Sequence, residues 1–277
     1  MTLAPDTFAF VADLVRRRSA IQLEPGKEYL VESRLLPLAR TAGLLDVDSY
    51  VRGIRAAPHP TTLEAVVEAL TTNETSWFRD ALPFRALVDH VVPEMLTATT
   101  SGMFAPQLRI WSAACSSGQE PYSIAMALAD VLAPSRMKIT ATDLSDQMLE
   151  RGRSGRYSQL EINRGLPAPM LVKHFTRAGA DWEIAQPLRS AVTFQRHNLL
   201  DAPPVGGPFD VVFLRNVLIY FDLATKRDVL RRVQQAMRPG GFLLLGAAET
   251  TIGVDDGWER VSVGRSSVYR LAPRRAA

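Results

Sequence analysis

The sequence is poor in cysteine and has no long apolar run. Its single cysteine, Cys115, makes a disulfide framework impossible, and one thiol is usual for a cytoplasmic protein. No apolar stretch approaches the roughly 20 residues that a membrane-spanning helix needs. The N-terminus also lacks the basic and apolar segments of a secretory signal peptide. We therefore expect a cytoplasmic protein that is not inserted in a membrane.

The sequence also lacks metal-ligand spacing. A structural zinc site needs cysteines and histidines in close pairs, and a lone cysteine offers none. The histidines are scattered along the chain, at His59, His90, His174 and His197. We therefore expect no metal ion.

The composition is that of an ordinary globular protein. The 277 residues are 47% hydrophobic and 22% charged, which is enough for one large domain or two modest ones. The formal net charge of +3 could help the chain to meet an acidic partner. It does not establish binding to a nucleic acid, and we expect none.

The pattern of apolar residues changes near the end of the first quarter of the chain. Up to residue 72 it follows helical spacing, as in segment 7–18, and nothing resembles a strand. After Trp77, short apolar strands alternate with helical segments, which predicts a parallel sheet with right-handed crossovers. We therefore expect a helical N-terminal domain over residues 1–72 and a doubly wound α/β domain over residues 73–277.

Candidate binding residues follow the first two predicted strands, because ligands of such sheets bind beside the carboxyl ends of strands. Residues 112–118 are small and include only one glycine, so they could form a turn that passes close to a ligand or only a tight turn between a strand and a helix. Asp143 could accept hydrogen bonds from ribose hydroxyls. No neighbouring basic residue is available to bind a 2′-phosphate, which favours an adenosine ligand over NADP. Asp143 could instead cap a helix near Ser145, and Glu120 could serve its helix dipole or reach into the site.

Two further segments carry polar residues at informative places. Arg215 and Asn216 follow an apolar strand at residues 209–214 and should project into the crevice, with Tyr220 one turn on. Tyr220 could also be a half-buried core aromatic with its hydroxyl in water. Segment 71–79 combines a polar cluster with aromatic residues and a cation, which helix capping alone does not explain.

Five segments of the sequence carry recognisable motifs, and they read TTNETSWFRD, WSAACSSGQEPYSIAM, ATDLS, RSGRY and FDVVFLRNVLIYFD. Together they resemble the CheR-type chemotaxis receptor methyltransferases, in that family's order. The resemblance covers nearly the whole chain and implies a Rossmann-like methyltransferase domain after a small all-α domain. It also implies a small antiparallel β subdomain, inserted at about residues 170–194. The implied cofactor is S-adenosylmethionine and the product S-adenosylhomocysteine.

The resemblance implies roles for the matching residues of the first three segments. Asn73, Thr75 and Arg79 would line the cofactor from the linker between the domains. Glu120 and Asp143 would contact the methionine and adenosine parts of the cofactor between them.

It implies roles for later positions as well. Asn198 and Leu199 would flank the adenine, while Arg215 and Asn216 would close the pocket. Tyr220 would lie near the point of methyl transfer.

The chain departs from the family's pattern at three places. Gln119 replaces the first glutamate of a GEEPYS run, which removes one charge near the cofactor. Leu214 stands where a cysteine is common, and residues 246–249 replace a more polar HSE-type run.

The resemblance further implies methylation of glutamate side chains of chemoreceptors, which gives glutamyl methyl esters. A glutamate has a pKa near 4.3, so it is already an anionic nucleophile at neutral pH and needs no general base. The enzyme must supply in-line positioning and exclude water. Arg79 and Tyr220 are the candidates for orienting and partly desolvating the attacking carboxylate.

The expected partners are the cytoplasmic helices of chemoreceptors. Some family members hold a receptor tail on the β subdomain through a glycine-bearing loop. The corresponding loop, residues 177–184, is short and has one glycine, so we expect that no receptor-tail pentapeptide is required. The receptor helices could instead meet basic N-terminal helices, although these arginines could also be solvated surface. They are Arg16, Arg17, Arg18 and Arg34.

Two other functional classes fit less well. A nucleic-acid N-methyltransferase would need an Asp/Asn-Pro-Pro-aromatic motif, and residues 201–205 read Asp-Ala-Pro-Pro-Val in a turn-like segment. A non-catalytic signalling scaffold would not need its site residues, yet these are intact. Titration with the cofactor separates an enzyme from such a scaffold.

Overall fold

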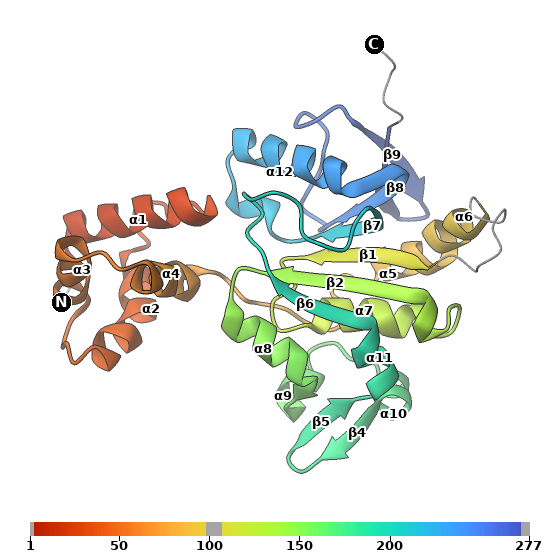
Figure 1. Ribbon diagram of the computed structural model, residues 1–277, viewed down its shortest axis with the longest axis horizontal. Coiled ribbons are helices and arrows are strands. Elements are labelled where there is room, and N and C mark those ends of the chain that lie inside the picture. The colour runs from red at the N-terminus through yellow and green to blue at the C-terminus, as the bar shows by residue number, and fades with distance from the viewer. Residues whose placement is uncertain (1–2, 98–106, 273–277) are drawn as a thin grey trace. The chain divides into compact units, whose positions relative to one another are not determined.

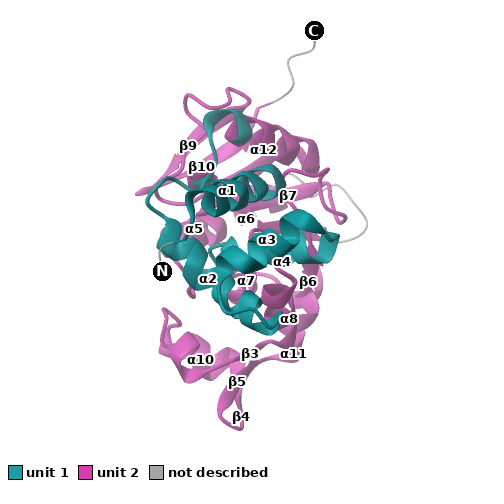
Figure 2. Cartoon of the chain, turned by 90° about the vertical axis from the view of Figure 1, so that its left-hand side faces the viewer, with its two compact units in different colours: residues 1–72, 220–225 teal, residues 73–219, 226–277 magenta. Residues whose placement is uncertain are grey.

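The chain divides into two compact units, which we describe separately. The computed structural model describes residues 3–97 and 107–272. The first unit holds the residues up to 72 together with residues 220–225, and the second holds residues 73–219 and those from 226 onward (Figure 2). Within the described residues, no helix is both long and apolar enough to cross a membrane.

The first unit is helical. Residues Val11, Val15, Leu35 and Ala39 are fully buried in it, at the four-residue spacing that places two side chains on one helix face. Pro37 lies inside a helix and does not end it, because the buried residues two positions before and after it hold that turn in the core. The helices are α1 (Pro5–Ser19), α2 (Glu28–Thr41), α3 (Val47–Ala56) and α4 (Pro60–Leu70).

The second unit is built on a large sheet (Figure 1). Its strands are β1 (Leu108–Ala113), β2 (Met137–Asp143), β6 (Val192–Arg196), β7 (Phe209–Leu214), β8 (Met237–Leu245), β9 (Trp258–Val263) and β10 (Ser266–Leu271). Their order is β6-β2-β1-β7-β8-β10-β9, and the first five run parallel to one another. β10 is antiparallel to both of its neighbours, β8 and β9. Because β2 and β7 flank β1 on opposite sides, the winding reverses at β1, and a ligand crevice is expected beside the carboxyl ends of β1 and β7.

The strands next to this point are buried on both faces. Every residue of β7 is buried, and Ile110, Ile139 and Phe213 have no exposed surface. Such strands read as continuous apolar runs in the sequence. The helices and short helical turns of this unit are α5 (Leu82–Ala86), the π-helical turn η1 (Leu87–Val91), α6 (Val92–Thr97), α7 (Gln119–Leu128), η2 (Pro134–Arg136), α8 (Asp146–Ser154), α9 (Gln159–Ile162), α10 (Ala168–His174), α11 (Gln186–Ala191), η3 (Leu218–Tyr220) and α12 (Leu223–Ala236). Two of them, η3 and α12, are each divided between this unit and the first, which holds residues 220–225.

A small antiparallel sheet lies in the stretch between β2 and β6. It contains β3 (Arg156–Tyr157), β5 (Asp181–Ile184) and β4 (Phe175–Ala178), in that order, and the β4–β5 hairpin projects away from the large sheet (Figure 1). The sheet starts before the expected range of about 170–194, because a two-residue strand leaves no alternating pattern in the sequence. Residues 192–196 pair with β2 in the large sheet. The predicted fold class, an all-α domain and a Rossmann-like domain with a small antiparallel insertion, is confirmed.

Candidate functional site

The loop after β1 is held in a strained conformation. Ala114 and Ser116 have φ values of 59° and 50°, which side chains rarely adopt, and Gly118 has a φ of 93°. A Cβ added at Gly118 would lie 2.9 Å from the Tyr157 hydroxyl, so a larger residue would not fit. The Cys115 N–H donates to the Thr142 carbonyl oxygen at 2.9 Å. Such strain persists only where the surroundings fix it, and it is typical of ligand sites.

Asp143, at the end of β2, holds this loop in place. Its Oδ2 accepts the Ser116 N–H at 2.7 Å and its Oδ1 accepts the Ser145 N–H at 3.0 Å. The N-cap of α8 is Ser145, whose Oγ accepts the Met148 N–H at 3.2 Å, so Asp143 is not the N-cap of that helix.

A buried arginine joins three parts of the second unit. The Arg215 side chain is 1% exposed, and its Nη1 donates to Glu120 Oε2 at 3.0 Å. Its Nη2 donates to Asp80 Oδ2 at 2.8 Å and to the Arg79 carbonyl oxygen at 2.7 Å. Ser112 Oγ donates to the other oxygen of Glu120 at 2.7 Å. The end of β7, the start of α7 and the segment after residue 78 therefore meet at one guanidinium group, and β1 joins them through the bond from Ser112 to Glu120.

Burial decides the protonation behaviour of this site. It raises the pKa of Glu120, while the charge of Arg215 and the hydrogen bond from Ser112 act in the opposite direction. Burial and then the Asp143 and Glu120 carboxylates raise the pKa of the Cys115 thiol well above its usual value. Cys115 therefore stays a neutral thiol and is not a nucleophile, because the thiolate is the reactive form.

The loop after β7 is fastened by Glu249, a residue that the sequence did not single out. Glu249 Oε2 accepts the N–H groups of Asn216 and Gly246 at 2.7 and 2.8 Å. Its Oε1 accepts those of Val217 and Leu218 at 2.9 and 2.7 Å. Asn216 has a φ of 56°, and these bonds hold it there. The only signal in the sequence was an acidic residue soon after an apolar strand.

The linker segment at residues 73–81 lies against the same loops. The Asn73 carbonyl oxygen accepts a hydrogen bond from Ser116 Oγ at 2.8 Å. Trp77 is buried, and its Nε1 donates to the Glu161 carbonyl oxygen at 3.0 Å. Arg79 is partly buried, and its Nη1 donates to the Glu74 carbonyl oxygen at 3.3 Å. Positive φ values recur in this segment, at Phe78, Asp80 and Ala81.

The remaining candidate residues of the site lie after β2, in the linker segment and in the first unit. The His197 N–H donates to the Asp143 carbonyl oxygen at 2.9 Å, which places the partly buried Asn198 and Leu199 just beyond the end of β2. Thr75, also partly buried, is a residue of the linker segment. Tyr220 is assigned to the first unit, where its carbonyl oxygen accepts the N–H of Gln22 at 3.3 Å.

The basic residues of the first unit have local partners. Arg16 and Arg17 both approach Asp13, at 3.4 and 2.7 Å, and remain largely exposed. Arg34 donates from Nη1 to the Thr71 carbonyl oxygen at 2.5 Å. Arg18, in the same run, is exposed.

The second unit's residues fit S-adenosylmethionine in chemical type. The cofactor carries ribose hydroxyls, an ammonium group and a sulfonium. The carboxylates of Asp143 and Glu120 can accept hydrogen bonds from the hydroxyls and the ammonium group, and their negative charges can balance the positive ones. The Nε of Arg215 is buried and has no hydrogen-bond partner among the described residues. No group of three metal-ligating side chains is placed to hold an ion in the part of the chain that the structure describes.

Comparisons with known proteins match both units. A family model described as the CheR methyltransferase SAM-binding domain matches residues 73–266, and one described as the CheR methyltransferase all-alpha domain matches residues 6–71. The chain is 41% identical to the chemotaxis protein methyltransferase Cher2 of Pseudomonas putida, over 92% of this chain and 94% of that protein. It is 39% identical to chemotaxis protein methyltransferase 1 of Pseudomonas aeruginosa, over 98% and 99%, and 36% identical to the chemotaxis protein methyltransferase of Escherichia coli, over 98% and 93%.

Proposed function

Because this chain belongs to the CheR methyltransferase family, we propose that it methylates glutamate side chains in the cytoplasmic helices of chemoreceptors. S-adenosylmethionine is the proposed donor, and the cytoplasm is the proposed place of action. The observation that supports this most strongly is the network around Arg215, which joins the linker to the carboxyl ends of β1 and β7. Such a network, buried where α/β sheets bind ligands, is expected of a preorganised site.

The cofactor supplies a methyl group on a positively charged sulfur, which makes the carbon electrophilic without help from an acid. Asp143 and Glu120 would hold its adenosine and methionine parts, and Asn198 and Leu199 would flank the adenine. Asn73 and Thr75 would line it from the linker, while Arg215 and Asn216 would close the site. The bound cofactor would supply its methyl group to a receptor carboxylate oxygen and would leave as S-adenosylhomocysteine.

The chain's own contribution is to position the carboxylate and exclude water. Correct alignment of two reacting groups can lower a barrier by about 7 to 11 kcal/mol. We propose that the Arg79 guanidinium and the Tyr220 hydroxyl orient the carboxylate by charge-assisted hydrogen bonds. Among the described residues, the Arg79 guanidinium has one hydrogen bond, to a backbone carbonyl, so its other N–H groups can serve a substrate.

The variants Arg79→Ala and Tyr220→Phe are expected to lower turnover more than cofactor affinity, because both groups are proposed to act on the carboxylate. Methyl transfer to a receptor fragment gives kcat, and calorimetry with S-adenosylhomocysteine gives the affinity. Unchanged turnover in Tyr220→Phe would remove the hydroxyl from the mechanism and leave Tyr220 as a structural aromatic residue.

Asp143→Ala is expected to weaken cofactor binding by about 1 to 3 kcal/mol, the usual cost of losing charged hydrogen bonds. Part of this loss comes through the loop, because the Ser116 N–H loses its acceptor. Calorimetry with S-adenosylhomocysteine measures it, and Asp146→Ala, an exposed residue of the same helix start, is the control. Equal affinities of the two variants would contradict the assignment of Asp143.

We propose that no receptor-tail pentapeptide is needed. β4 is an edge strand of only four residues, and the turn to β5 holds the two residues Gly179 and Ala180. A peptide that adds a strand needs backbone groups in register along an open edge, and this edge is short. Titration of a receptor-tail pentapeptide is expected to show no saturation at micromolar concentration. Micromolar binding that Gly179→Val abolishes would overturn the proposal.

Receptor recognition would then depend on helices of the first unit, including the basic residues of α1. Arg16, Arg17 and Arg18 are exposed in the last turn of that helix, and Asp13 partly offsets their charge. Arg34 donates a hydrogen bond to a backbone carbonyl oxygen, so fewer of its N–H groups remain to bind a receptor.

Calorimetry with S-adenosylmethionine separates this function from a non-catalytic scaffold. Binding of the donor and of S-adenosylhomocysteine is expected, and failure to bind either would exclude the enzyme. Transfer of label to a receptor fragment but not to DNA or RNA would separate it from a nucleic-acid methyltransferase.

A further inference from the structure

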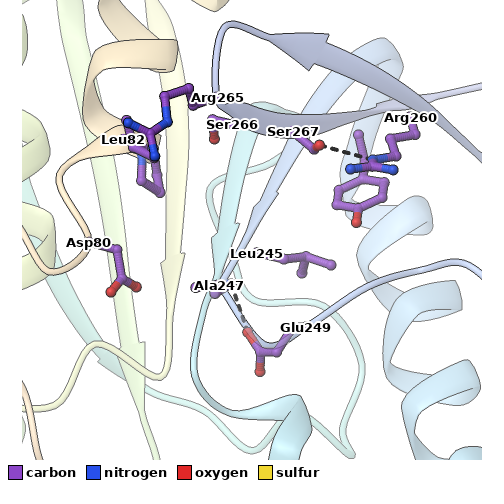
Figure 3. A pocket seen from close by; sticks show the side chains of 12 residues that line it. Asp80, Leu82, Leu245, Ala247, Glu249, Arg260, Arg265, Ser266 and Ser267 are labelled. Carbon is purple, nitrogen blue, oxygen red and sulfur yellow. Dashed lines mark hydrogen bonds between the residues drawn. The ribbon is translucent and has the colours of Figure 1, made fainter.

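A cavity of about 270 Å³ opens beside the Arg215 network, within the second unit (Figure 3). Asp80 both lines this cavity and binds Arg215, and Glu249 both lines it and holds Asn216. β10 runs antiparallel to β8, so the first residues of β10 lie beside the last residues of β8, at the rim that carries the candidate site. Any group in this cavity is therefore a neighbour of the Arg215 network and of the loop that carries Asn216.

The acidic side of the cavity has its main acceptors occupied. Glu249 accepts four backbone N–H groups, two on each oxygen. Asp80 accepts from the buried Arg215, which is itself shared with Glu120. Glu249 is therefore poorly placed to bind a cation of a ligand, because both of its oxygens serve the fold, and the charge of Asp80 is offset by Arg215.

The basic side has spare donors. Arg260, Arg265, Ser266 and Ser267 lie on the opposite side of the cavity from Glu249 (Figure 3). Arg260 donates from Nε to Ser267 Oγ at 2.9 Å, and its terminal N–H groups have no acceptor among the described residues. Arg265 lies in the turn between β9 and β10 and is exposed. It has no ion-pair partner among the residues that the structure describes. Two arginines with free N–H groups suit a planar carboxylate, which they can bind through paired hydrogen bonds.

We propose that this cavity, which we call the hairpin pocket, binds a second acidic side chain of the receptor segment whose glutamate is methylated. The inference rests on the proposed function, because it names part of the substrate of the same site. The pocket would fix the register of the receptor helix and so select which glutamate reaches the methyl group. It would add affinity for the receptor without touching the cofactor.

Initial rates with a chemoreceptor cytoplasmic fragment test this in the full chain. Arg260→Gln and Arg265→Gln are each expected to raise KM for the fragment about three- to tenfold, the effect of losing one hydrogen bond of ordinary strength at an exposed side chain. The kcat and the affinity for S-adenosylhomocysteine should stay as in the unmodified chain. Lys138→Gln is the control, because it removes an exposed charge near the start of β2, at the end opposite Asp143, and it should leave KM unchanged. Unchanged KM in both arginine variants would overturn the pocket.

A second arm identifies the ligand. Acidic residues of the receptor fragment are replaced by glutamine one at a time, and one replacement should raise KM with the unmodified enzyme but not with the Arg260→Gln, Arg265→Gln double variant. Inorganic phosphate is the probe for a free anion. If the double variant loses inhibition by phosphate while its KM for the receptor is unchanged, the pocket serves a small anion and the proposal is wrong. If the unmodified chain methylates no receptor glutamate, the proposed function fails and the pocket inference falls with it. Methylation with normal KM in both variants rejects the pocket alone.

Discussion

Replacing Arg215 by methionine is expected to abolish measurable methyl transfer and to lower the free energy of unfolding by about 3 to 5 kcal/mol, the cost of removing one partner of a buried charge network. Methionine fills most of the volume beside the Phe84 ring, over which the guanidinium lies at 5.5 Å, so packing loss is small. What is lost is the only cation bonded to Glu120 among the described residues, together with one bond to the Arg79 carbonyl oxygen. Chemical denaturation and methyl-transfer rates measure the two effects.

The destabilisation should depend on pH. Burial raises the pKa of Glu120 above its ordinary value of 4.5, so the stability tied to its proton is present below that value and is lost as pH rises through the raised pKa. The charge of Arg215 lowers this pKa, and its removal moves the pKa further up and deepens the loss. Arg215→Met should therefore destabilise the protein more at neutral pH than near pH 4.5.

An exposed arginine provides the control for this variant. Arg231 is 60% exposed and approaches Asp228 and Asp255 at 3.8 Å, so Arg231→Met should change stability by no more than about 0.5 kcal/mol. If Arg215→Met were as mild as this control, or had the same effect at both pH values, the network would not be an organising element of the site.

Glu249→Gln is expected to be the second most damaging change. The amide presents one acceptor oxygen, and its NH₂ group faces two backbone N–H donors that each lose their partner. Unsatisfied buried donors cost about 1 to 3 kcal/mol each, so two of them are expected to lower the free energy of unfolding by about 2 to 6 kcal/mol. Release of the loop moves Asn216 from its positive φ, and misplacement by about an ångström can lower turnover about 100-fold.

A general loss of stability is separated from a positioning role by kinetics below the melting temperature. A variant that is folded but misaligned should show a lower kcat with nearly normal KM for the receptor fragment. Glu259→Gln, on the exposed face of β9, is the control and should match the unmodified chain. Normal kcat in folded Glu249→Gln would show that the four bonds do not position the site.

The fold could be predicted where burial leaves a periodic signal. The strand at residues 209–214 was predicted with the bounds that β7 has, because both of its faces are buried and every residue is apolar except Asp210. The helical domain was visible through its helical spacing. The strand β3 was missed because two residues carry no pattern, and its pairing with β5 depends on residues some 25 positions away in the sequence.

The site was only partly predictable for a related reason. Arg215 and Glu120 could be named from their places after a strand and at a helix start, and the network contains both. Asp80 and Glu249 were missed, because their roles depend on backbone conformations and contacts that no local pattern encodes. Asp80 reaches Arg215 across 135 positions, from a backbone with a φ of 65°. Positive φ in a non-glycine residue is imposed by tertiary structure, and residue type alone does not reveal it.

Glutamate carboxylates of chemoreceptors are the proposed acceptors of the methyl group. The most direct test is mass spectrometry of a chemoreceptor cytoplasmic fragment after incubation with the full chain and S-adenosylmethionine, before and after mild base. We predict methyl groups on glutamate side chains that mild base removes, and none when Arg215→Met replaces the unmodified enzyme. A fragment that stays unmodified, or that carries base-stable methyl groups on other residues, would contradict the account.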